Sequence, residues 1–229
     1  MPAVLVCGIT PSDVAIHFTS SMLRMQTDLA RTPGVSVNFE FFVTVNDALK
    51  HFADAPQFDV CVLIDGQMAV EPQFILQNDM TKHVVVATYP IRKIDWDRVR
   101  AKALETKTSP AGGATEPVQN VGITYNYDPR HGEPEPGGRY IRLPARTPVQ
   151  LKIFKLTRHA LDTMLAKAPQ PGPAFVLHAA GVEDMVGMTA DARLCHVWGD
   201  AIYADITAKT QNIGPFDFTG TVGLRKRLR

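Results

Sequence analysis

The feature that most constrains the fold is a short apolar run that ends in a single acid. Residues 58–72 read FDVCVLIDGQMAVEP, and the apolar, mostly β-branched run 60–64 leads directly into Asp65. A strand that is apolar on both sides is typical of a sheet whose two faces are covered by helices. The run therefore predicts a core strand of an α/β protein. In open α/β sheets, ligands bind at the carboxyl ends of such strands.

The N-terminal half alternates strand and helix patterns in the order of a βαβαβ unit. We expect strands at 3–9, 35–43, 59–64 and 83–90, and helices at 12–31, 46–55 and 72–79. This alternation predicts a Rossmann-like, mostly parallel sheet covered by helices. Neither GxxxxGK[ST] nor GxGxxG occurs, which disfavours P-loop NTPases and dinucleotide dehydrogenases.

The composition changes near residue 109. Residues 109–148 hold 13 Pro or Gly in 40, which is typical of loops, and within them 120–127 and 139–145 suggest a hairpin-like insertion. Regular patterns then resume: we expect a helix at 158–168, a strand at 174–180 and a last helix at 199–212. The C-terminal half is thus irregular and mixed.

The charge and the cysteine content limit the partners and the cellular compartment that we expect for this protein. A formal charge of +1 gives no general electrostatic reason to bind nucleic acid, and no apolar run approaches the ~18 residues that span a bilayer. The three cysteines are far apart and suggest neither a disulfide framework nor a zinc site. The start of the chain lacks the pattern of a signal peptide. We expect a soluble protein of the reduced cytoplasm, without a membrane span or a nucleic-acid partner.

The segment around the acidic strand end resembles the central segment of GT-A fold glycosyltransferases. It reads VLIDGQMAVEPQFILQNDMTKHVVVATYPIRKIDW over residues 62–96. In that family a strand ends in Asp-x-Asp, and here Asp65-Gly66-Gln67 stands in its place. A Tyr-Pro segment with a basic residue follows in the family, and here Tyr89 and Lys93 match it. The resemblance implies a GT-A-like α/β fold that binds a nucleotide-sugar.

Two further matches extend the donor site that the resemblance implies. Ile9 and Thr10 follow the first strand, where the family's loop wraps the nucleotide base, and Asn46 matches the start of a family helix. A late match, VWGDAIYADI, resembles a helix start whose acid contacts the acceptor sugar or serves as the base. By this resemblance Asp200 is the expected catalytic base, with Trp198 and Gly199 on the acceptor side.

A metal ion follows from the same resemblance. The leaving diphosphate of a nucleotide-sugar can be neutralised by Mn²⁺ or Mg²⁺, which oxygen ligands bind. Asp65 and Gln67 are the expected ligands. Because Gln67 supplies a neutral amide oxygen, we expect weak binding that depends on the phosphate oxygens of the nucleotide.

These expectations combine into one functional hypothesis. The chain is expected to be a single GT-A-like domain with a nucleotide-binding half (1–104), a Pro/Gly-rich insertion (105–148) and an acceptor-side half (149–229). It would transfer a sugar from a UDP- or GDP-sugar to a hydroxyl of a glycan or glycoprotein. Two alternatives stay open: a transferase-like fold that has lost turnover and serves as a binding or structural component, and an unrelated Rossmann-like nucleotide binder.

Overall fold

The computed structural model describes residues 2–10, 16–34, 36–91, 95–108, 122–167 and 190–212. The strands are β1 (Val4–Ile9), β2 (Val37–Phe42), β3 (Val60–Asp65), β4 (Met68–Val70), β5 (Val84–Ala87), β6 (Glu133–Pro134), β7 (Tyr140–Leu143), β8 (Ile153–Thr157), β9 (Ile202–Asp205) and β10 (Thr210–Asn212). The helices are α1 (Ile16–Ala30), α2 (Val45–Asp54), α3 (Pro72–Leu76), α4 (Trp96–Thr108), α6 (Arg158–Lys167) and α8 (Ala190–Trp198), with a 3₁₀ turn η1 (Pro129–His131).

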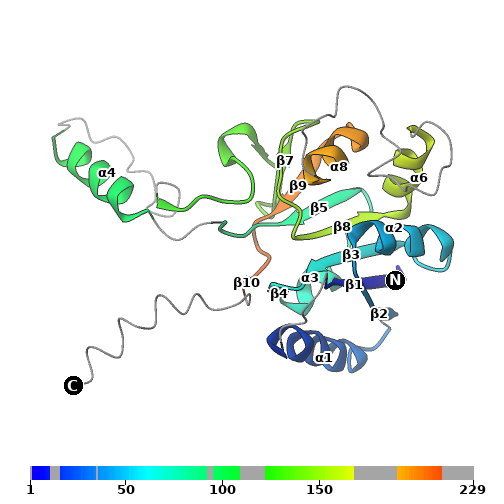
Figure 1. Cartoon of the computed structure of the whole chain (residues 1–229). Helices are drawn as coiled ribbons and strands as arrows, with labels where there is room; N and C mark the ends of the chain where they lie inside the picture. The colour runs from blue at the N-terminus through cyan, green and yellow to red at the C-terminus, as the bar shows by residue number, and fades with distance from the viewer. Residues whose placement is uncertain are drawn as a thin grey trace, which may run out of the picture.

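An eight-stranded sheet forms the core of this described part, in the order β2-β1-β3-β8-β5-β9-β7-β6 (Figure 1). Strands β10 and β4 pair separately as a short antiparallel ribbon. The predicted strands of the N-terminal half are confirmed, and β1 pairs in parallel with both β2 and β3. The result is a Rossmann-like α/β arrangement.

Helices cover both faces of the sheet because each carries one apolar stripe. On one face α1 buries Phe18, Met22, Met25 and Leu29, which recur at the three- and four-residue spacing of a helix. On the other face α2 buries residues 48, 49 and 52 within the core that α6 and α8 also cover. The strands between, such as β3 and β8, are therefore buried on both sides.

The sheet is mixed rather than mostly parallel as predicted. Strand β8 lies between β3 and β5 and is antiparallel to both, whereas β5 and β9 are parallel. All five residues of β8 are buried, so this late segment takes a central position. Strand β7 also joins the main sheet, between β9 and β6, and the expected separate hairpin of 120–127 with 139–145 is wrong.

The predicted helix at 199–212 is also wrong. Helix α8 ends at Trp198, and the chain then forms β9 and β10. Gly199 has φ +66°, a left-handed conformation that glycine adopts without a steric penalty, and it terminates α8. The segment that follows is the strand β9, in which Tyr203 is half-buried and the other three residues are buried. The strand predicted at 174–180 lies outside the described residues.

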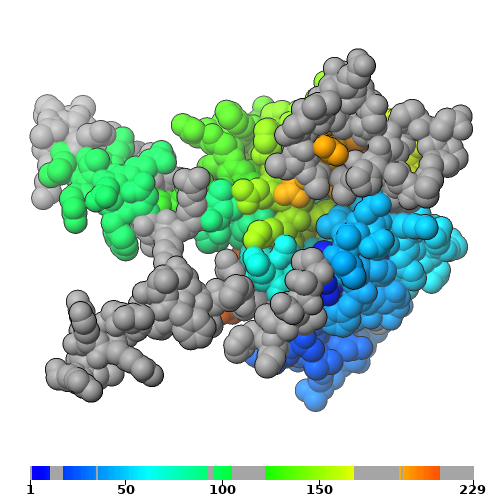
Figure 2. All heavy atoms as spheres, in the orientation of Figure 1, coloured from blue at the N-terminus to red at the C-terminus, as the bar shows by residue number. Residues whose placement is uncertain are grey.

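Helix α4, which we did not predict, extends away from the sheet (Figure 2). Its first residue, Trp96, is exposed. Among the described residues, no helix combines the length and the apolar character needed to cross a membrane.

Candidate functional site

Three strands meet where β3 ends. Ile9 and Asp65 are register partners at the carboxyl ends of β1 and β3. The amide of Gly66 donates to the carbonyl of Ile9 at 2.8 Å, and the amide of Asp65 donates to the carbonyl of Lys152 at 2.7 Å, just before β8. A side chain at position 66 would place its Cβ 3.0 Å from the Ile9 oxygen, so the close approach of these strands favours glycine.

Within the Asp-Gly-Gln turn, the side chain of Gln67 contacts Lys152. Asp65 Oδ1 accepts a hydrogen bond of 2.8 Å from the amide of Gln67, which fixes the carboxylate at the strand end. The ammonium of Lys152 donates to Gln67 Oε1 at 3.3 Å. Gln67 is exposed, and Asp65 and Lys152 are half-buried, so this group is accessible from solvent.

Tyr89 holds the segment that carries Lys152. Its buried hydroxyl donates to the carbonyl of Gln150 at 2.9 Å and accepts the amide of Lys152 at 3.1 Å. Burial raises the pKa of the Tyr89 phenol well above its usual value, so the hydroxyl stays protonated. The side chain of Asn126 bonds the carbonyls of Ala87 and Gln150 and thereby ties β5 to the same segment. Tyr89, a predicted site residue, is therefore a positioning residue beneath the site.

Asp191 brings a second carboxylate to the same edge. It lies in the first turn of α8, and its Oδ2 accepts the amide of Leu151 at 3.2 Å. Burial raises the pKa of Asp191, and the negative charge of Asp65 adds to that rise, whereas the positive charge of Lys152 opposes it. Asp191 thus interacts electrostatically with both Asp65 and Lys152, and the three residues form one acid–lysine cluster. We use the name acid–lysine cluster for these three residues.

Our sequence prediction missed two of these three residues. The signal for Asp191 was available: it precedes apolar residues at 194, 195 and 198, at the spacing of a helix face that begins with an acid. For Lys152 no local signal exists, because its place depends on the insertion of β8 between β3 and β5.

The predicted nucleotide residues lie along the same edge. Thr10 follows β1, and its amide bonds the carbonyl of Phe42 at the end of β2, at 2.8 Å. Asn46 lies in the first turn of α2, and its buried Oδ1 finds no hydrogen-bond partner among the described residues. An unpaired buried acceptor is costly, and a ligand donor would satisfy it. Lys93 lies outside the described residues.

The structure places Asp200 at the opposite edge of the sheet. Because β9 is parallel to β5, the start of β9 lies beside the start of β5, where His83 approaches Trp198 with ring centroids 6.1 Å apart. Asp200 follows the end of α8 and opens no helix, so the premise for its catalytic role is wrong. Trp198 is buried and donates through Nε1 to the carbonyl of Ala201 at 3.0 Å, as a packing residue would.

The donor set at Asp65 and Gln67 fits a divalent cation poorly. One carboxylate oxygen of Asp65 accepts a hydrogen bond from the Gln67 backbone amide, and the side-chain oxygen of Gln67 accepts one from the ammonium of Lys152. In the described part of the chain no cluster of three or more His, Cys, Asp or Glu side chains could hold a metal ion. A metal that binds only with the nucleotide stays a prediction.

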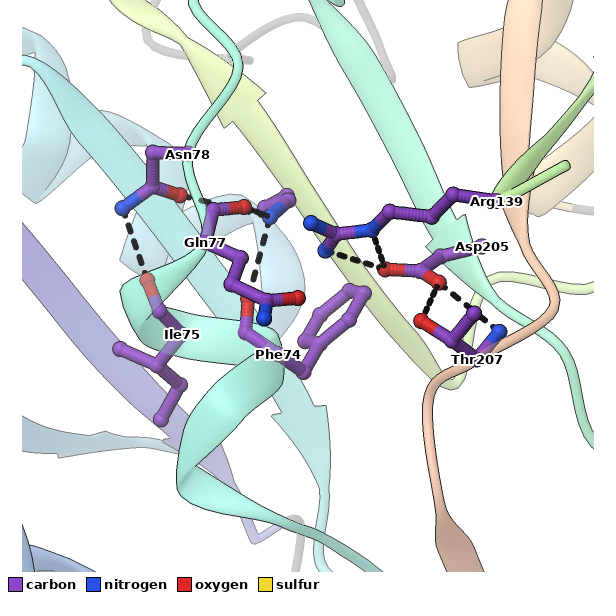
Figure 3. A network of polar contacts seen from close by, with 8 residues as sticks. Phe74, Ile75, Gln77, Asn78, Arg139, Asp205 and Thr207 are labelled. Atoms are coloured by element: carbon purple, nitrogen blue, oxygen red, sulfur yellow. Dashed lines mark hydrogen bonds and ion pairs between the residues drawn. The ribbon is translucent and has the colours of Figure 1, made fainter. Parts of the chain in front are cut away.

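A second network of charges lies away from this site, around Lys155. Figure 3 shows Phe74, Gln77 and Asn78 on one side and the ion pair of Arg139 with Asp205, 2.7 Å long, on the other. Asp205 also accepts from the hydroxyl of Thr207 at 2.8 Å. Lys155 bonds the first set and Asp205 bonds Arg139 and Thr207, so these charged groups have their partners within the fold, and we assign them a structural role.

Comparison with known proteins gives distant structural similarities alone. No protein-family profile matches the chain, and no curated protein sequence does. Among solved structures, A197 from STIV is 12% identical, with 91% of this chain and 84% of that chain covered and a TM-score of 0.47. HddC from Yersinia pseudotuberculosis, complexed with GMP-PN, is 8% identical over 99% of this chain and 100% of that chain, with a TM-score of 0.40.

A glycosyltransferase involved in the glycosylation of the major capsid of PBCV-1 is 8% identical, with 90% of this chain and 93% of that chain covered and a TM-score of 0.30. All these scores lie below 0.5, so they carry no argument about the activity of this chain. They also leave open whether its Rossmann-like arrangement is of the GT-A type. The functional argument therefore depends on the site itself.

Proposed function

We propose that this protein binds a nucleoside diphospho-sugar, with UDP or GDP as the nucleotide, and transfers the sugar to a hydroxyl of a glycan or glycoprotein. The observation that carries the proposal is the acid–lysine cluster. Its members come from distant parts of the chain and meet at the carboxyl edge of the sheet, where β1, β3 and the start of β8 converge. Open α/β sheets bind ligands at this edge.

The nucleotide would lie along Ile9, Thr10 and Asn46. Ile9 ends β1 opposite Asp65, Thr10 follows it, and Asn46 lies in the first turn of α2, after the neighbouring strand β2. The unpaired Oδ1 of Asn46 is an acceptor for an N–H of the base, which both uracil and guanine present. The diphosphate would then extend toward Gly66 and Gln67, next to Asp65.

Asp191 is our candidate for the general base. In an inverting transfer, the acceptor oxygen attacks the anomeric carbon, its proton passes to a carboxylate, and the nucleoside diphosphate leaves with the electrons of the broken C–O bond. Burial and the charge of Asp65 raise the pKa of Asp191 toward the range in which a base is efficient. Its place in the first turn of α8 keeps the carboxylate oriented.

The test compares two acids with the same substitution. Removal of a positioned base typically costs ~10²–10⁴-fold in rate. Asp191→Asn should lose activity by that order in donor hydrolysis and in transfer, with nucleotide affinity retained in calorimetry. Asp200→Asn, at the opposite edge, should retain the wild-type rate. The reverse pattern would return the base role to Asp200.

A binding protein with a transferase-like fold is the second candidate. Gln67 in the position of the second acid, in contact with Lys152, favours it, because this change weakens the usual metal site. A wild-type protein that binds UDP or GDP tightly but turns over no donor in a broad panel would support this second candidate. Absence of binding for every nucleoside diphosphate at millimolar concentration would overturn both.

A further inference from the structure

We infer that Lys152 binds the diphosphate of the nucleotide directly and takes the place of a divalent cation, so that nucleotide binding needs no metal. The inference rests on the proposed function and assigns a residue that our sequence prediction did not identify. It arises from the poor fit between the side chains at the Asp-Gly-Gln turn and a metal ion.

The backbone of Lys152 is fixed to the site from two sides. Its carbonyl accepts the amide of Asp65 at 2.7 Å, and its amide donates to the hydroxyl of Tyr89 at 3.1 Å. Tyr89 is only 2% exposed, so this anchor is rigid. The side chain of Lys152 therefore starts from a fixed point beside Asp65, and it remains half-buried, with access to solvent.

The ammonium of Lys152 contacts one of the two expected metal ligands. Its Nζ is 3.3 Å from Gln67 Oε1, the amide oxygen that would be the second metal ligand. A divalent cation on that oxygen would repel the ammonium at close range. One N–H group of Lys152 is directed to Gln67, and an ammonium has two more that can donate to phosphate oxygens.

The amide at position 67 fits this assignment. A carboxylate there would form an ion pair with Lys152 and neutralise the charge that a phosphate needs. Gln67 holds the ammonium through a neutral oxygen, so the positive charge stays available to a ligand. Asp191 adds a carboxylate that interacts electrostatically with Lys152 at the same edge.

The experiment measures UDP and GDP affinity by calorimetry, with uridine and guanosine as ligands that lack phosphate. Wild type, Lys152→Gln and Lys50→Gln are each titrated in Mg²⁺ and in EDTA. Lys50 is exposed on α2, so its replacement changes the net charge equally without touching the cluster. We expect unchanged wild-type affinity in EDTA. Lys152→Gln should weaken diphosphate binding by roughly 10–100-fold, as loss of a charge-assisted bond does, and leave nucleoside binding unchanged.

A second variant distinguishes diphosphate binding by Lys152 from diphosphate binding by a metal ion, because the two predict opposite changes in nucleotide affinity. Gln67→Glu gives Lys152 a charged partner, so we expect weaker UDP and GDP binding in EDTA and no rescue by Mg²⁺. If a metal holds the diphosphate, the same variant should bind more tightly in Mg²⁺. Wild-type binding that EDTA abolishes, with Lys152→Gln unaffected, would overturn this inference alone. A wild-type protein that binds neither diphosphate would overturn the proposed function and this inference with it.

Discussion

Replacement of Lys155 by methionine should destabilise the protein more at pH 9 than at pH 6. Lys155 lies in the middle of β8 and is 4% exposed. Its Nζ donates to the carbonyl of Phe74 at 3.0 Å and of Gln77 at 2.6 Å, around the end of α3 (Figure 3). Methionine keeps the apolar stem but leaves both carbonyls without their donor, a cost of about 1–3 kcal/mol for each buried acceptor.

The pH dependence follows from the position of the amine. Burial lowers the pKa of Lys155 from 10.5 to about 7, and the charge of Arg139 lowers it further, whereas Asp205 and Asp79 oppose the shift. A neutral amine has two N–H donors, which match the two shorter contacts; the third acceptor, Asn78 Oδ1, is 3.4 Å away.

The magnitude follows from the protons that each state binds. Between the folded pKa of about 7 and the unfolded value of 10.5, the unfolded chain holds a proton that the native state lacks. Stability therefore rises with pH in this window, by about 1.4 kcal/mol per pH unit, and Lys155 contributes least below pH 7. Methionine cannot titrate. From pH 6 to pH 9 the wild type should thus gain about 3 kcal/mol relative to Lys155→Met.

Urea unfolding at pH 6 and pH 9 measures this difference directly. Wild type, Lys155→Met and the exposed control Lys50→Met are compared at both values, and the control should show no change in its relative stability with pH. Equal destabilisation by Lys155→Met at both pH values would refute the reasoning, because it would mean that Lys155 carries the same charge in the folded and unfolded states.

Two further predictions concern groups that hold distant segments together. Arg158→Lys should lower the free energy of unfolding by about 2–3 kcal/mol in urea, because one ammonium cannot reach the carbonyls of Phe52, Ala55 and Phe58 that the guanidinium bonds together. A loss below 0.5 kcal/mol would contradict that role. Tyr89→Phe removes a buried hydroxyl that bonds the chain before β8 twice, so we expect a loss of about 1–3 kcal/mol and weaker UDP binding. An unchanged free energy of unfolding together with unchanged UDP affinity would contradict this role of Tyr89.

The N-terminal half was predictable because its signals are local. Apolar strands, helix stripes and turn residues alternate there within short distances, and β1, β2, β3, α1, α2 and α3 lie close to the expected ranges. Asp65 was also predictable, since a carboxylate that follows a buried strand must lie at the carboxyl edge of the sheet. The sequence by itself thus determined the part of the candidate site that β1 and β3 provide, including Asp65.

The part of the site that carries Lys152 and Asp191 depends on tertiary structure. Local patterns do not specify which strand neighbours which, and burial of the whole β8 strand between β3 and β5 is what brings Lys152 next to Asp65. The same holds for the segment after Trp198. This segment is a strand because it pairs with β5 and β7. Asp200 therefore lies at the opposite edge of the sheet, whereas the start of α8, with Asp191, lies at the site. Strand order and pairing are long-range consequences of burying a common core. They placed Asp191 and Lys152 at the site, whereas the short-range sequence pattern placed Asp65 there.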